Sequence, residues 1–183
     1  MKVLVVYDSM FGNTAQVATA IGDALRGGDE VTVVPVAEAT PARMAEAELL
    51  FVGSPTQRFR PLPAVSELLK RLPGDSLASV RVAAFDTRIE IAEANSRILS
   101  FMVRLLGPSS FAAPRIEAAL RRAGGTLAAP FEGFIVDGTE GPLREGELER
   151  AAQWARRAAG ANAVRVAAEA PRQAAPSRTR VPS

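Results

Sequence analysis

The sequence of 183 residues contains no cysteine and no histidine. Disulfide bonds, zinc sites built from cysteine and histidine, thiol catalysis and a serine–histidine–aspartate triad are therefore excluded. Redox or group-transfer chemistry in this chain has to come from a bound cofactor or from carboxylates. Hydrophobic residues make up 48% of the sequence, which is enough to fill one core at this length.

Long apolar runs are also missing. No stretch of about 18 apolar residues occurs, so no segment is suited to span a membrane as a helix. The N-terminal residues MKVLVVYDS lack the long apolar segment and the cleavage site of a secretory signal peptide. We therefore expect a cytoplasmic protein that does not associate with membranes.

The basic charge is concentrated at the C-terminal end of the chain. The formal net charge is +2, and residues 161–183 contain four arginines against one glutamate, so residues 1–160 are close to neutral. The same segment is rich in alanine and proline and has no apolar periodicity, which predicts a disordered tail after a single domain of residues 1–160. No aromatic residue lies among these arginines, so we do not expect nucleic-acid binding.

The most informative stretch is VLVVYDSMFGNTAQVATAI, which begins at Val3 and ends at Ile21. Its first residues form a continuous apolar run, typical of a strand buried on both faces of a parallel sheet. Apolar residues then recur at helical spacing from Ala15 onward. At the turn between strand and helix, the first backbone N–H groups of the helix are free and the positive end of its dipole is exposed. A helix N-terminus of this kind can bind a phosphate group.

The turn by itself leaves two interpretations open. Ser9 and Asn13 could simply cap the helix, with Gly12 relaxing a tight turn, as in many α/β proteins. Alternatively, the turn binds a phosphate group. It lacks the lysine of the G-x-x-x-x-G-K-[ST] loop and the glycines of G-x-G-x-x-G, so neither standard nucleotide-binding loop is present.

Strands and helices alternate along the rest of the chain. Further strands are expected at residues 30–36, 49–53 and 80–85, and a fifth at 125–136 that pauses at Pro130. Helices are expected at 41–48, 64–72 and 145–157, and two between 90 and 122, on either side of residues 107–110. Alternation of this kind predicts an α/β fold, a three-layer sandwich around a five-stranded parallel sheet with strand order 2-1-3-4-5.

In such a sheet, ligands bind beyond the carboxyl ends of the strands where the strand order reverses. The loops after the third and fourth strands should therefore face the Ser9–Thr14 turn. Their candidate binding residues are Pro55, Thr56, Gln57, Arg58, Phe59, Asp86, Thr87 and Arg88.

The spacing of Tyr7, Ser9, Gly12, Thr14, Ala18 and Ile21 resembles the flavodoxin signature, and Gly53–Thr56, Phe85–Arg88 and Gly138–Leu143 resemble later flavodoxin loops. The resemblance covers residues 1–160 and implies a short-chain flavodoxin-like domain that binds FMN. It implies that the isoalloxazine ring lies between residues 54–60 and 86–90. It also implies phosphate binding by Ser9, Met10, Phe11, Gly12, Asn13 and Thr14.

The sequence departs from the family at the ring. Flavodoxins commonly stack an aromatic side chain of the third loop on the flavin, whereas no aromatic residue lies between Phe85 and Phe101. Phe59 is either a ring partner or a residue that packs on the next helix. Arg58, Arg60 and Arg88 are either solvated surface residues or bring positive charge to the ring, in which case a bound flavin is less strongly reducing than in acidic flavodoxins.

The leading hypothesis is an FMN-binding electron carrier that serves one or more redox partner proteins. Two alternatives stay open: an NAD(P)H-dependent flavin or quinone reductase, and a flavodoxin-like interaction domain without redox use. The apolar segment 98–106 is either part of the core or the surface of a weak homodimer.

Overall fold

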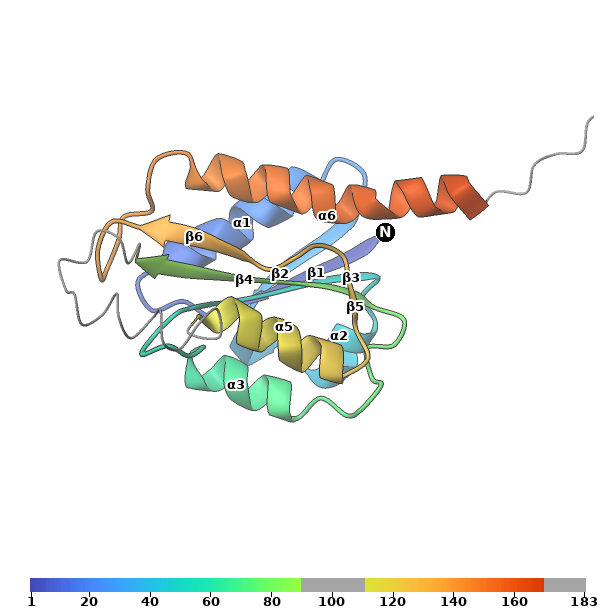
Figure 1. Ribbon diagram of the computed structural model, residues 1–183, viewed down its shortest axis with the longest axis horizontal. Coiled ribbons are helices and arrows are strands. Elements are labelled where there is room, and N and C mark those ends of the chain that lie inside the picture. Colours follow the sequence, from blue (N-terminus) through green and yellow to red (C-terminus); the bar gives the residue numbers. More distant parts are fainter. Residues whose placement is uncertain (90–110, 170–183) are drawn as a thin grey trace, which may run out of the picture.

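The computed structural model describes residues 1–89 and 111–169. A parallel sheet lies between two layers of helices, which confirms the predicted three-layer α/β sandwich (Figure 1). The strands are β1 (Lys2–Tyr7), β2 (Glu30–Pro35), β3 (Leu49–Pro55), β4 (Arg81–Ile89), β5 (Thr126–Leu127) and β6 (Glu132–Val136). The helices are α1 (Asn13–Leu25), the 3-10 turn η1 (Val36–Glu38), α2 (Pro41–Ala45), α3 (Pro63–Lys70), α5 (Ala112–Arg122) and α6 (Glu147–Glu169).

The strand order is β2-β1-β3-β4-β5, and all pairs are parallel, which confirms the predicted order. The fifth position of the sheet is shared by β5 and β6, which pair with successive parts of β4. The interruption contains Pro130, whose ring nitrogen cannot donate to the ladder. The pause expected in the fifth strand is thus a break between two short strands.

Each face of the sheet has its own core, because successive side chains of a strand point to opposite faces. On one face Val3 and Val5 of β1 pack beneath α1 and α6. On the other face Leu4 and Val6 pack beneath α2, α3 and α5 (Figure 1). Trp154 of α6 meets three phenylalanine rings edge-on, at centroid distances of 5.4, 6.3 and 6.2 Å, and anchors this helix to the sheet.

Helix α6 continues to Glu169, whereas the sequence predicted a disordered tail from residue 161. Four of the nine residues in the extension are alanine, which has the highest helix propensity, and no glycine or proline occurs there before Pro171. Residues 170–183 and the apolar segment 98–106 lie outside the described residues. No helix in the described part of the chain combines the length and apolar character needed to cross a membrane.

The carboxyl ends of β1, β3, β4 and β6 all point to one edge of the sheet (Figure 1). Strands β3 and β4 extend past the end of β1, because Tyr7 pairs with Gly53, and β3 then continues to Pro55 opposite Thr87. The loops that follow these strands therefore surround the N-terminus of α1.

Candidate functional site

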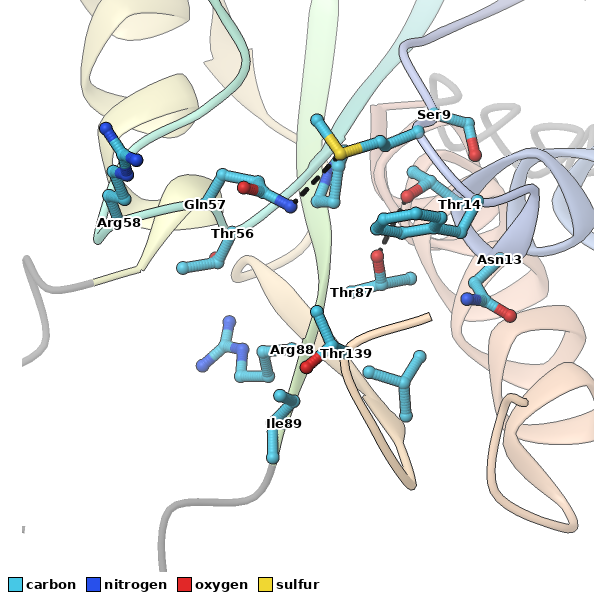
Figure 2. Close-up of a pocket in the computed structure, with 14 residues that line it drawn as sticks. Ser9, Asn13, Thr14, Thr56, Gln57, Arg58, Thr87, Arg88, Ile89 and Thr139 are labelled. Carbon is cyan, nitrogen blue, oxygen red and sulfur yellow. Dashed lines mark hydrogen bonds between the residues drawn. The ribbon is translucent and has the colours of Figure 1, made fainter. Parts of the chain in front are cut away.

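A pocket with a volume of about 190 Å³ lies at this edge of the sheet (Figure 2). It is bordered by the Ser9–Thr14 turn, by the loop after β3, by the end of β4 and by the segment after β6. The structure thus brings together the three stretches that the sequence singled out. The lining residues are Ser9, Met10, Phe11, Asn13, Thr14, Pro55, Thr56, Gln57, Arg58, Thr87, Arg88, Ile89, Val136 and Thr139.

The N-terminus of α1 opens into this pocket. Gly12 precedes the helix with φ of 87°, a left-handed conformation that glycine adopts without steric cost. No side chain of the described residues caps the helix, and its first turn contains no acidic residue. Ser9 Oγ instead accepts a hydrogen bond from the N–H of Gly12 at 3.1 Å, which draws the turn into a loop around the helix end. The unpaired N–H groups and the helix dipole make this end of the pocket suited to an anion.

Two buried hydroxyl groups lie next to the helix end. Thr14 Oγ1 and Thr87 Oγ1 are 2.8 Å apart and join the first turn of α1 to the end of β4 (Figure 2). One hydroxyl donates to the other, so the second hydroxyl keeps its own hydrogen for another acceptor. The pair therefore fixes the geometry of the pocket floor and can still donate one hydrogen bond to a ligand.

Asn13 connects the Ser9–Thr14 turn to the segment after β6. Its side-chain Nδ2 donates to the carbonyl oxygen of Glu140 at 2.8 Å. Gly141, with φ of 110°, lies so close to the Asn13 carboxamide that a Cβ there would be 2.6 Å from it. This contact places Thr139 at the rim of the pocket (Figure 2).

The loop after β3 forms a tight turn between Gln57 and Arg60, whose backbone groups exchange two hydrogen bonds of 2.9 Å. Arg58 and Phe59 occupy its centre with φ of 47° and 64°. Both are left-handed conformations that a Cβ disfavours, so this glycine-free turn holds two residues in a backbone geometry that is usually left to glycine. The Gln57 side chain donates to Met10 Sδ at 3.4 Å and links this turn to the first one (Figure 2).

Asp86 belongs to strand β4 but does not line the pocket. Its side chain is completely buried and accepts hydrogen bonds from Arg88 Nε at 2.5 Å, Thr56 Oγ1 at 3.1 Å and the Ala113 N–H at 2.8 Å. Burial raises the pKa of the Asp86 carboxyl, and the neighbouring Arg88 guanidinium opposes that increase. Thr56 Oγ1 also accepts from the Ala112 N–H at 2.8 Å. Asp86 thus fastens the second loop to the N-terminus of α5.

Two of the three arginines of these loops, Arg58 and Arg88, line the pocket. The Arg88 guanidinium pairs with Asp86 and lies 3.9 Å from the centre of the Phe111 ring. A Cβ on Gly133 would overlap this guanidinium, so the glycine leaves room for it. Arg60 lies on the far side of the turn, in a different groove, and Arg58 is the more exposed of the two arginines that line the pocket. That arginine charge makes a bound flavin less strongly reducing stays a prediction, and in this structure it concerns Arg58 and Arg88.

Of the predicted binding residues, Gly12, Phe59 and Asp86 do not line the pocket. Three lining residues were not predicted. Ile89 continues β4 beyond Arg88, Val136 ends β6, and Thr139 belongs to the segment Gly138–Leu143 whose resemblance to flavodoxins had been noted. Applying the rule that sites lie at strand ends to the fifth strand position would have identified Val136 and Thr139.

Comparison with solved structures identifies the same architecture in flavoproteins. Flavodoxin 1 of Bacillus cereus superimposes with a TM-score of 0.68 at 13% identity, over 87% of this chain and 97% of that one. A flavodoxin from the domain Archaea gives 0.61 at 22% identity, over 88% and 99%. The rubredoxin oxygen:oxidoreductase of Desulfovibrio gigas gives 0.63 at 19% identity, and the match covers 92% of this chain but 37% of that longer one. Neither the known protein-family models nor the curated protein sequences match this chain. The chain has the flavodoxin-like fold of short-chain flavodoxins.

Proposed function

We propose that this chain is an FMN-binding electron-transfer protein. The observation that carries the proposal is the uncapped N-terminus of α1, which opens into a pocket bordered by the loops after β1, β3, β4 and β6. Flavodoxins, which share this fold, are among the most similar solved structures. FMN, when bound, supplies one- and two-electron redox chemistry that the side chains of this protein cannot perform.

The phosphate end of the pocket fits a phosphate monoester. Its donors are backbone N–H groups of the Ser9–Thr14 turn and the free hydrogen of the Thr14–Thr87 hydroxyl pair. No arginine or lysine lies within this turn, so binding depends on oriented dipoles and not on a paired cation. These N–H groups and the hydroxyl would bind a dianionic phosphate without a cationic side chain of the turn to neutralise its charge.

The other end of the pocket fits part of a flat ring. Apolar side chains of Met10, Ile89 and Val136 border it, and the turn of Gln57 and Arg58 closes one side. A volume of about 190 Å³ is below the roughly 300–1,000 Å³ of pockets that enclose a whole small ligand. The pocket would therefore cover part of FMN and leave an edge of the ring accessible, an arrangement suited to electron exchange with a partner protein.

The lining favours a carrier over a reductase that must deliver protons. Among the described residues that border the pocket there is no carboxylate, and the chain has no histidine or cysteine. The Asp86 carboxylate is not part of the pocket lining, and its oxygens are occupied by Arg88, Thr56 and Ala113. The described side chains of the pocket thus position a ligand but include no carboxylate, histidine or cysteine to act as a proton donor.

The visible absorption spectrum tests this proposal. The purified protein is incubated with FMN, freed of excess by gel filtration and reduced with dithionite under argon. Residual dithionite is then removed by anaerobic gel filtration before the protein is mixed with oxidised cytochrome c, a one-electron acceptor. We expect flavin absorption to elute with the protein and the reduced sample to reduce cytochrome c. Flavin that elutes only with small molecules would contradict FMN binding. Rapid oxidation of NADH or NADPH by the loaded protein would favour the reductase instead.

A further inference from the structure

We propose that the groove between α3 and α5 is the docking site for an acidic segment of a partner protein. This groove is separate from the cofactor pocket and has a volume of about 340 Å³. Cationic side chains line it from both helices and from the turn that precedes α3, and apolar atoms form its floor. The residues on which the argument depends are Arg60, Lys70, Arg115, Arg122, Pro61 and Leu69.

The two helices run in the same direction away from the cofactor pocket (Figure 1). Helix α3 begins at Pro63, directly after the second loop, and α5 begins at Ala112, whose N–H is bonded to Thr56 of that loop. Arg60 and Arg115 therefore lie at the end of the groove next to the pocket, and Lys70 and Arg122 lie at the far end. With a rise of 1.5 Å per residue, Arg115 and Arg122 are about 10 Å apart along α5.

The positive charge of this face is local. Residues 57–72 and 111–123 contain seven arginines and lysines against two glutamates, although residues 1–160 as a whole are close to neutral. Glu67 pairs with Lys70 at 2.7 Å, and Glu117 accepts from the Phe131 N–H at 3.0 Å. Within the described part of the chain no carboxylate forms an ion pair with Arg122. No carboxylate is among the described residues that line the groove, so the lining itself is positively charged.

The distribution of the cations favours an extended ligand. A small anion requires donors that converge on one point, whereas these cations lie at two ends of a groove about 10 Å long. An extended peptide covers that distance with about three residues. Its carboxylates can reach both ends while an apolar side chain contacts Pro61 and Leu69. A single nucleic-acid strand fits less well, because none of the described residues that line the groove is aromatic and could stack on bases.

Because of its position, the groove would hold a bound partner segment close to the cofactor pocket. The turn of Gln57 to Arg60 separates the groove from the cofactor pocket, and Arg58 faces the pocket while Arg60 lines the groove. A partner segment bound along α3 and α5 would end one turn away from the pocket. The inference goes beyond the proposed function, and the binding itself does not require FMN.

The test is direct binding of a short fluorescein-labelled peptide of alternating glutamate and leucine, followed by fluorescence anisotropy without FMN. A glutamine–leucine peptide is the ligand control. The groove variant is Lys70→Gln/Arg122→Gln. The matched control is Arg156→Gln/Arg157→Gln, which removes two exposed charges from α6 on the opposite face of the sheet. Thermal unfolding of each variant checks that the domain remains folded.

We expect the glutamate peptide to bind and the glutamine peptide not to bind. The groove variant should lose about tenfold in affinity and the α6 variant less than twofold, because each exposed ion pair contributes only a few-fold. Binding should disappear at about 0.5 M salt, where the Debye length is only a few ångströms. Equal losses in both variants, or equal binding of an oligo(dT) strand with the same dependence on Lys70 and Arg122, would overturn the proposal.

Discussion

Replacement of Asp86 by asparagine would disrupt the network that fastens the cofactor pocket to α5. The carboxylate accepts three hydrogen bonds, from the Arg88 side chain, the Thr56 hydroxyl and the Ala113 backbone. An asparagine has one oxygen acceptor in place of two, and its NH₂ group can only donate. If the amide oxygen keeps Thr56 and Ala113, the NH₂ group faces the Arg88 Nε–H, and two donors oppose each other.

The expected cost follows from burial. Asp86 is fully buried and the Arg88 side chain is 15% exposed, so the variant leaves a largely desolvated cation without its partner. Removal of one member of a buried ion pair costs about 3–5 kcal/mol. Because a domain is stable by only about 5–15 kcal/mol, the variant should lose a large fraction of its free energy of unfolding.

Urea denaturation at pH 7, followed by the fluorescence of Trp154, measures this loss. The midpoint should fall while the slope stays constant, since the surface exposed on unfolding is unchanged. Asp137→Asn is the matched control, because it removes the same charge from an exposed pair with Arg144 and should cost about 0–1 kcal/mol. A loss below about 1 kcal/mol for Asp86→Asn, or equal losses for both variants, would refute the structural role of Asp86.

Two further predictions concern stability. Arg58→Gly should raise the free energy of unfolding by about 0.5 kcal/mol, because it removes a left-handed non-glycine residue. Arg60→Gly, at a position without positive φ, should lower the free energy of unfolding by about 0.5–1 kcal/mol. A change of the same sign in both variants would contradict the turn geometry. Gly133→Ala should cost about 1–3 kcal/mol by displacing the Arg88 guanidinium, and the cost should shrink in an Arg88→Ala background, as a double-mutant cycle can show.

The fold was predictable because each strand carries an unambiguous local signal. The run from Val3 to Val6 is apolar at every position, as a strand buried on both faces requires, and it is fully inside the structure. Pro130 likewise predicted the break in the fifth strand. The end of α6 was not predictable in the same way, because an alanine-rich sequence can continue a helix without any apolar periodicity.

The location of the site was predictable from the sequence, but the contacts of its side chains were not. The rule that ligands bind at strand ends located the loops, and the structure brings them together in one pocket. Sequence could not show that Asp86 points away from the pocket to α5, because that depends on the contact between β4 and Ala113. Nor could it show that Phe111, distant in sequence, lies against Arg88. Side-chain partners of this kind are set by tertiary packing, which the local pattern does not contain.

The central claim is that the N-terminus of α1 binds the phosphate of FMN, and parallel titrations with FMN and riboflavin test it most directly. The two ligands share the ring and differ in the phosphate. Loss of about two charge-assisted hydrogen bonds should make riboflavin bind about 100-fold more weakly. Thr14→Val should weaken FMN binding by about tenfold and leave riboflavin binding unchanged, since Thr14 lies beside the helix end. Equal affinities for FMN and riboflavin, measured by quenching of flavin fluorescence, would contradict the account.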